Sequence, residues 1–262
     1  MKNIVVASAI FLASSNAIAH SNVCDYSLDY NVKVDDRQVI FSKSSGKTII
    51  LTEDELIIDG SVKELNRQQA TAHKALYQET KQILPKIADI AIEGAEIGVT
   101  AATIVISSFF GNDPEVKTDL IEPVESVAKK IKDNINKNFL NTEKLSNSFD
   151  QEFDAEIESL VEKALSKYSG KAISRVIDAI FSNDAEEVKD FEFRMETLEQ
   201  DIETYVDGKA KNLEIKAESL CSDIANLAAY DRELENIVGY PDRGVIYIGS
   251  DSGFKMSNIT IN

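Results

Sequence analysis

Residues 82–111 read QILPKIADIAIEGAEIGVTAATIVISSFFG. On an α-helix, steps of four and three residues return to nearly the same azimuth, so the polar residues of this stretch fall on one narrow stripe. The stripe consists of Gln82, Lys86, Asp89, Glu93, Glu96, Thr100, Thr103 and Ser107. Nearly all the other residues are apolar or small. This pattern predicts a helix that is wrapped on most sides, either by other helices or by lipid.

The same stretch carries a ridge of small residues, in which Gly94 and Gly98 have the GxxxG spacing that lets a second helix backbone come close. The ridge consists of Ala91, Gly94, Ala95, Gly98, Ala101 and Ala102. Buried helices of soluble bundles share this pattern, so we expect a central core helix, and a membrane-seeking helix is the alternative.

The chain begins like an exported protein. Lys2 precedes an apolar run at residues 4–13, and Ala17 and Ala19 have the A-x-A arrangement of a cleavage site. The apolar run is about half as long as a bilayer-spanning segment. We therefore expect residues 1–19 to be a signal peptide that is cleaved after Ala19, which leaves an exported, soluble protein.

The composition limits the classes of partner. The 262-residue chain has a formal net charge of −17, and removal of Lys2 with the signal peptide would make it −18. So acidic a chain repels nucleic acid and anionic phospholipid, and it has no compensating block of Lys and Arg residues. We therefore exclude nucleic-acid binding.

The chain contains two cysteines, Cys24 and Cys221. Export would place them in an oxidising compartment, where we expect them to form a disulfide bond that closes a loop of nearly two hundred residues. A loop of that length corresponds to about 5 kcal/mol in the chain-entropy model. Two buried free thiols are the alternative. A zinc site is less favoured, because two cysteines cannot complete the ligand shell.

The hydrophobic pattern divides the mature chain into three segments. Residues 20–65 alternate with a period of two, and short β-branched runs at 28–34, 39–41, 48–51 and 56–58 predict a small antiparallel β-meander. Residues 66–240 predict a helical bundle. Residues 241–262 form a strand-like extension. The expected fold is mainly α, an elongated bundle of about five to seven helices with the N-terminal meander, an α+β arrangement.

The helical segment begins after Asn66, a good N-cap residue. Apolar spacing indicates helices near residues 65–84, 82–111, 120–135, 149–168, 173–180 and 191–227. Pro85 either kinks a long helix or opens a new one, and Gly208 is the expected break in the last helix. The runs 245–248 and 254–261 predict two strands around Asp251, which would form a hairpin and complete the N-terminal sheet. A tail without regular structure is the alternative.

Several landmarks together resemble one known family. They are the early Cys24, LTEDELIIDG at residues 51–60, LNRQQATAHKALYQETKQILPKIADIA at 65–91 and AESLCSDI at 217–224. They resemble the YggN-like family of proteobacterial envelope proteins, a domain of unknown function. The resemblance covers roughly residues 24–235, and it implies a periplasmic location, a Cys24 to Cys221 pair and no established activity. The strand-like end after Pro241 departs from the family pattern.

Motifs with catalytic associations are incomplete in this sequence. Ser45-Gly46-Lys47-Thr48 imitates the end of a phosphate-binding loop but lies in a predicted hairpin and lacks the first glycine. Residues 249–253 resemble a nucleophile elbow, yet Asp251 occupies the position of the serine. His73 is the only histidine besides His20, and we expect it to be a helix-surface or half-buried residue rather than a catalytic base.

We therefore predict no catalytic, cofactor-binding or metal-ligating residues. The favoured function is a non-enzymatic binding or structural role in the cell envelope, with an unidentified envelope protein or component as partner. A membrane-active protein that deploys residues 82–111 is the first alternative. It is less favoured because the uncharged run 97–112 is 16 residues long, short of about 20, and because Asp89, Glu93 and Glu96 would have to be desolvated or face a lumen. A hydrolase that uses His73 or a carboxylate pair is the lesser alternative.

Overall fold

The computed structural model describes residues 26–110, 113–147, 158–160, 162–168, 193, 196–198, 200, 202–248 and 254–255. The expected signal peptide at 1–19 with its cleavage site, Cys24, the helix expected at 173–180 and the Asp251 turn lie outside these residues. The helices expected at 149–168 and 191–227 are described only in part.

A seven-stranded antiparallel sheet confirms the predicted meander and extends it. Its strands are β2 (Asn31–Val34), β3 (Val39–Ser42), β4 (Thr48–Leu51), β5 (Leu56–Ile58), β6 (Ser61–Lys63), β7 (Ile135–Asn136) and β8 (Phe139–Leu140). Their order is β6-β5-β4-β3-β2-β8-β7. β2 to β6 are consecutive neighbours, and the β5–β6 turn has positive φ angles at Asp59 and Gly60, as expected for a two-residue hairpin loop.

The β7–β8 hairpin comes from the segment that we predicted to be helical. Ile135 was expected on a helix because it follows Ile131 by four residues, but the helix ends at Asn134 and Ile135 lies in β7. Asn136 accepts a hydrogen bond from Asn138 N–H in the turn, at 2.9 Å, and such side-chain caps compete with the helix. Ile135 and Leu140 are fully buried, so the hairpin contributes two side chains to the core.

A second sheet joins the two ends of the described chain. β1 (Tyr26–Leu28) lies between β9 (Ile246–Ile248) and β10 (Phe254–Lys255), and both pairings are antiparallel. The C-terminal strands therefore pair with an N-terminal strand, as predicted. The predicted hairpin is wrong, because β9 and β10 flank β1 instead of pairing with each other, and they do not complete the larger sheet.

The helix predicted around residues 82–111 is part of a much longer one, α1 (Arg67–Phe110), which contains Pro85. Asn66 and Gln69 cap its start reciprocally, each side chain accepting from the other's backbone N–H at 3.0 Å, in the manner of a capping box. The chain continues through α2 (Pro114–Val116), the π-helical η1 (Lys117–Ile121), α3 (Glu122–Asn134), α4 (Thr142–Asn147), η3 (Ala164–Tyr168), η4 (Ile202–Asp207) and α8 (Gly208–Arg232). The predicted break at Gly208 is wrong, since Asp207 has helical dihedrals and α8 follows η4 directly.

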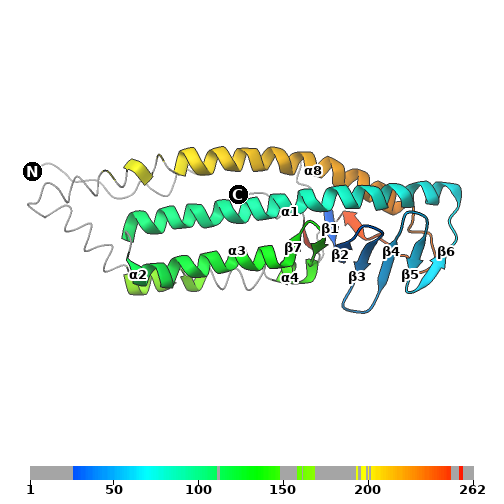
Figure 1. Cartoon of the computed structure of the whole chain (residues 1–262), viewed down its shortest axis with the longest axis horizontal. Helices are drawn as coiled ribbons and strands as arrows, with labels where there is room; N and C mark the ends of the chain where they lie inside the picture. The colour runs from blue at the N-terminus through cyan, green and yellow to red at the C-terminus, as the bar shows by residue number, and fades with distance from the viewer. Residues whose placement is uncertain are drawn as a thin grey trace, which may run out of the picture.

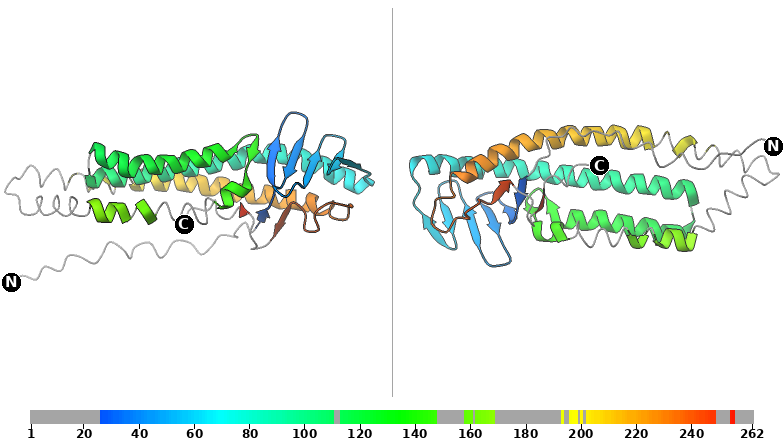
Figure 2. Two further views of the ribbon diagram at one scale, coloured as in Figure 1. Left: turned by 90° about the horizontal axis from the view of Figure 1, so that it is seen from below. Right: turned by 180° about the vertical axis from the view of Figure 1, so that it is seen from behind.

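α1 lies between α8 on one side and α3 on the other, and the strands gather around its N-terminal half (Figures 1 and 2). The described parts of these helices therefore form an elongated layer, with α1 in the middle. Within this layer α1 packs against a helix on two sides only. The described helices therefore leave its two other faces uncovered.

The core forms where α1 crosses the larger sheet. One face of the sheet is buried, with alternating residues pointing inward: Val32, Val34, Val39, Phe41, Ile49, Leu51, Leu56 and Ile58. The first half of α1 contributes Ala72, Leu76, Tyr77, Ile83, Leu84, Ile87, Ala88 and Ile90 to the same cluster. α8 adds Leu213, Leu220, Ile224, Leu227 and Ala228.

A buried carboxylate, Asp231, connects the end of α8 to β9. Its side chain is fully buried. It accepts hydrogen bonds from the Tyr240 hydroxyl and from the backbone N–H groups of Val245 and Ile246, the latter two at 2.7 and 2.9 Å. Burial raises the pKa of Asp231 to about 6, although these hydrogen bonds lower it.

Gly244 is required for this arrangement. Its φ of +74° lies in the left-handed region that favours glycine. A Cβ at this position would lie 2.1 Å from Asp231 Oδ2, so no larger residue fits while the carboxylate keeps its place.

We expect Asp231 to make folding pH-dependent. Its folded pKa of about 6 exceeds the ordinary value of 3.8, so the folded state takes up a proton first as the pH falls. As the pH falls from about 7 to about 4, the Asp231 contribution to the free energy of unfolding therefore rises by about 2 kcal/mol. Urea denaturation of wild type and Asp231→Asn across this range checks the effect, with the exposed Asp242→Asn as control. A wild-type minus Asp231→Asn difference that stays constant with pH would contradict it.

Candidate functional surface

The polar stripe of α1 joins it to both neighbouring helices. Lys86 Nζ lies 2.6 Å from Asp223 Oδ2 of α8, and Glu93 pairs with Lys216 of the same helix. On the other side, Glu96 Oε1 lies 2.8 Å from Lys132 Nζ of α3.

Further along α1, the Tyr205 hydroxyl donates to Thr100 Oγ1 at 3.4 Å. These pairs are partly exposed, and each such pair contributes at most about 1 kcal/mol. Their spacing along α1 matches the register in which α8 and α3 pack against it. Gln82 and Asp89, two other members of the stripe, are exposed.

The ridge of small residues is used at only one of its two glycines. A Cβ added to Gly94 would lie 3.4 Å from Leu213 Cδ2, so the Leu213 side chain of α8 already lies against this glycine. Among the described residues, a Cβ added to Gly98 would meet nothing within 4 Å. The approach of a second helix at Gly98 therefore stays a prediction.

The far half of α1 is apolar but poorly covered. α1 is long and apolar enough to cross a membrane, and only 11% of its 18-residue window with mean hydropathy 1.6 is buried. Gly98 is exposed and Val105 is 37% exposed. Seven residues apart, they share one side of the helix, opposite the polar stripe. We call Gly98, Ala102 and Val105 the open α1 face. The first half of α1 is thus well buried, whereas most residues of the far half are only partly buried.

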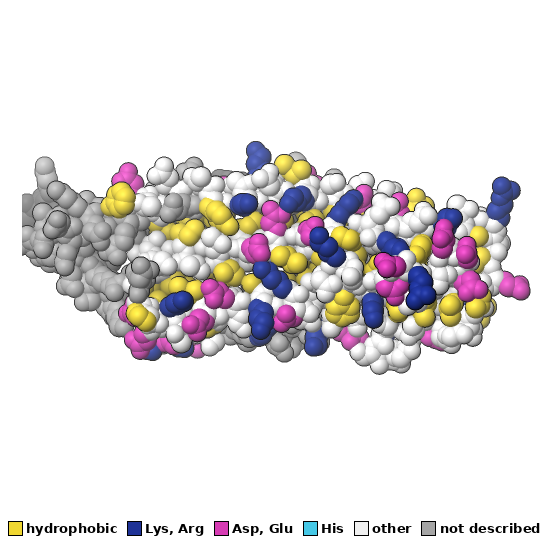
Figure 3. Space-filling model, in the orientation of Figure 1, with side chains coloured by type: hydrophobic (Ala, Val, Ile, Leu, Met, Phe, Trp, Pro, Cys, Tyr) yellow, Lys and Arg dark blue, Asp and Glu magenta, His cyan; other side chains and the backbone are white. Residues whose placement is uncertain are grey.

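Hydrophobic side chains also line the far half of α1 on the side shown in Figure 3, along its borders with α8 and α3. Between these borders the surface of α1 is formed mainly by backbone and uncharged polar side chains. The helix layer thus presents apolar side chains at its surface along both borders of α1 (Figure 3).

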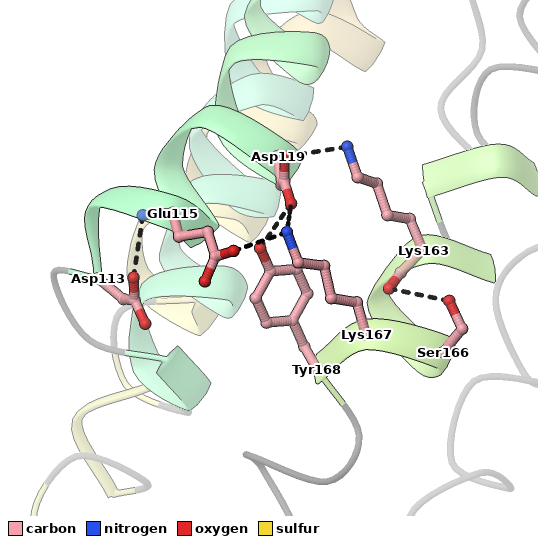
Figure 4. A network of polar contacts seen from close by, with 7 residues as sticks. All are labelled: Asp113, Glu115, Asp119, Lys163, Ser166, Lys167 and Tyr168. Atoms are coloured by element: carbon pink, nitrogen blue, oxygen red, sulfur yellow. Dashed lines mark hydrogen bonds and ion pairs between the residues drawn. The ribbon is translucent and has the colours of Figure 1, made fainter.

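At the far end of the layer, a polar network joins η1 to the helix that contains η3 (Figure 4). Asp119 accepts hydrogen bonds from Lys167 Nζ at 2.5 Å and from the Tyr168 hydroxyl at 2.7 Å. Lys163 Nζ lies 3.0 Å from the other oxygen of Asp119, and Lys167 also pairs with Glu115 at 2.8 Å.

The hydrogen bonds and ion pairs of this network stabilise the ordinary protonation states of its residues at neutral pH. The hydrogen bonds from Lys167, Tyr168 and Lys163 hold the pKa of Asp119 well below its usual range. Asp119 and Glu115 in turn raise the pKa of Lys167, and burial raises that of the Tyr168 hydroxyl. Lys167 and Tyr168 are therefore protonated at neutral pH, which makes them poor nucleophiles or bases.

The network rests on a small apolar cluster of its own. Val116, Leu120 and Tyr168 are buried together, with Ile106, Phe110 and Leu160 packed against them. The rings of Phe110 and Tyr168 are 5.6 Å apart and inclined by 60°. This cluster anchors the end of α1, so the open α1 face lies between two packed regions.

The other predicted positions have structural surroundings. His73 is more buried than expected, only 2% exposed, and its Nε2 lies 3.0 Å from the Glu55 carbonyl oxygen. Burial lowers the pKa of His73. Ser44, beside the phosphate-loop-like segment, donates its N–H to the Glu143 carboxylate at 2.9 Å. A carboxylate therefore lies against this β3–β4 turn.

An open groove of about 570 Å³ lies between the ends of α1 and α8. It is lined by Arg67, Gln68, Thr71, Ala72, Ala229, Tyr230 and Glu233. Gln68 Nε2 donates to Glu233 Oε2 at 2.6 Å. The described residues contain no group of three or more His, Cys, Asp or Glu that could hold a metal ion.

Cys221 is half-buried on α8. Its expected partner, Cys24, lies outside the described residues, so no disulfide pair is described and the Cys24 to Cys221 pairing stays a prediction.

Sequence reasoning did not single out Asp119 or Asp231. Lys163 and Lys167 are four residues apart, which places both on one side of a helix and could have indicated a shared acidic partner. Asp231 lies in the last turn of α8, where the helix dipole disfavours a negative charge. An acidic residue in that position is a signal for a specific hydrogen-bonding role.

Comparisons with known proteins give one match. The family model described as protein of unknown function (DUF2884) matches residues 24–240. No curated protein and no solved structure matches the chain.

We expect the two glycines of the GxxxG pair to respond differently to substitution. Gly94→Val should lower the free energy of unfolding by about 1–3 kcal/mol, because the added carbons would overlap Leu213. Gly98→Val should leave it unchanged or raise it by a few tenths of a kcal/mol, because the site is open and glycine is a poor helix former. Chemical denaturation of both variants checks this difference. Equal destabilisation would show that Gly98 is also closely packed.

Proposed function

The chain belongs to the DUF2884 family of proteins of unknown function, and we propose that it is an exported, non-enzymatic protein of the cell envelope. In this proposal it binds a partner protein through the far half of α1. The observation that carries the proposal is the low burial of the most apolar part of the longest described helix.

Apolar surface of this kind is costly to leave in water, and large exposed apolar patches commonly mark interaction sites. The open α1 face combines a glycine with small side chains, which would let a partner helix approach its backbone. Packed regions at both ends of α1 hold this face in place, so a partner would bind a rigid surface.

The ion pairs along α1 favour a protein partner over a bilayer. Glu93 and Glu96 are paired with Lys216 and Lys132. Insertion of α1 into lipid would separate these pairs or bury all four charges, either of which is costly. A protein that docks on the opposite, open α1 face leaves the pairs intact.

The finer parts of the proposal follow from the sequence. The signal-peptide pattern at residues 1–19 supports export to the periplasm, where a Cys24 to Cys221 disulfide would form. The resemblance to YggN-like envelope proteins supports the same location. The incomplete catalytic motifs and the protonated state of Lys167 and Tyr168 support a non-enzymatic role.

Site-specific photo-crosslinking in cells tests this binding surface. A benzoylphenylalanine at Val105 should yield a discrete adduct with an envelope protein. The same group at Ile215 of α8, which is 57% exposed, is the control and should not yield that adduct. Absence of a discrete adduct at Val105, or the same adduct at both positions, would count against the proposal.

A membrane-active protein is the second candidate, and the length and apolarity of α1 favour it. Flotation of the mature protein with vesicles, in oxidised and reduced forms, separates the two candidates. We expect the protein to stay at the bottom in both forms, because the ion pairs hold α1 in the helix layer. Flotation of the reduced form alone would show that the disulfide restrains a membrane-seeking helix. Flotation of both forms would exclude the proposal that α1 binds a partner protein instead of lipid.

A further inference from the structure

The outward face of the larger sheet carries an apolar row. Ile40 is paired with Ile50, Ile50 with Ile57, and Ile57 with Val62, in register across β3 to β6. These residues alternate with the buried ones, so they point away from the core. The flanking rows on this face are polar, with Ser42 and Thr48 paired on one side. We call Ile40, Ile50, Ile57 and Val62 the outer row.

The outer row ends at the edge of the sheet. β6 is the last strand, and Val62 is 59% exposed. In a two-residue hairpin the pair next to the turn, here Ile58 and Ser61, is hydrogen-bonded, and the following pair is not. The N–H and C=O of Val62 therefore point away from β5, toward the free edge. Such an edge is a template for another strand.

The surroundings of this edge are acidic. Between Thr52 and Asn66 the chain has five acidic residues, Glu53, Asp54, Glu55, Asp59 and Glu64, and one basic residue, Lys63. Arg67 follows at the start of α1, and Lys74 pairs with Glu53 at 3.6 Å, so the balance of charge remains acidic. All five acidic residues are exposed. Glu64 directly follows the end of β6, two residues after Val62, and both residues are exposed.

We propose that the β6 edge binds an extended segment of a partner protein that adds to the sheet as an eighth strand and carries basic residues. An apolar side chain opposite Val62 would continue the outer row. A Lys or Arg two positions away would lie beside Glu64. Because β6 has only three residues, the edge offers few backbone hydrogen bonds, and the apolar and charged contacts must provide much of the affinity.

The charge of the chain argues against a second copy as the occupant. Two copies joined at β6 would bring their acidic edges together, and each chain has a formal net charge of −17. Like charges placed opposite one another on neighbouring strands are destabilising. A basic strand has the complementary charge, and its binding should weaken as salt is added.

The test uses the full mature protein and a fluorescein-labelled peptide, Gly-Lys-Thr-Val-Thr-Lys-Gly, followed by fluorescence anisotropy. We expect saturable binding at low salt that weakens at high salt. Val62→Pro removes the edge N–H and should weaken binding about tenfold. Glu64→Lys should weaken the binding of this peptide. It should strengthen the binding of a peptide in which both Lys residues are replaced by Glu.

Glu214→Lys is the matched control, because Glu214 is an exposed acidic residue on α8, far from the edge. Glu214→Lys and Val105→Lys should both leave peptide binding unchanged. Because Val105 belongs to the open α1 face, this result would show that the β6 edge binds independently of the surface proposed on α1. Equal binding of the Lys and Glu peptides, or no effect of Glu64→Lys, would overturn the proposal. So would a dimer in sedimentation velocity that Val62→Pro abolishes, since the edge would then serve a second copy.

Discussion

The structure depends on a mismatch in length between α1 and the sheet that it crosses. Seven strands about 4.8 Å apart span about 29 Å, which is the length of about 19 helical residues. The buried residues of α1 against the sheet run from Ala72 to Ile90, close to that number. α1 has 44 residues, so more than a third of it continues beyond the sheet and must find other neighbours.

The two halves of α1 therefore meet different kinds of neighbour. The first half is held by hydrophobic burial. Its buried polar side chain His73 contacts one partner, the Glu55 carbonyl oxygen. The far half is held at its borders by ion pairs to α8 and α3 and at its end by the Tyr168 cluster. This arrangement keeps an apolar helix in a defined position without enclosing it, which is the property that a binding surface requires.

Local signals in the sequence predicted the local structure well. The run 56–58 indicated a strand and Asn66 a helix start, and both signals depend only on neighbouring residues. The sequence could not show how far the sheet extends, because β8 pairs with β2 through residues as far apart in the sequence as Val32 and Leu140. For the same reason Gly94 and Gly98 looked equivalent, although only Gly94 meets α8. The partners of Asp231 are similarly set by a loop whose path the helix pattern does not reveal.

The small sheet has a consequence for the order of events during folding. β1 is the first described strand, and Tyr26 pairs with Ile248, so more than two hundred residues separate the two partners. A chain that emerges N-terminus first must keep β1 unpaired until nearly all of it has appeared, and contacts this distant in sequence form slowly. Completion of the small sheet is thus a late step that can occur only on an essentially full-length chain.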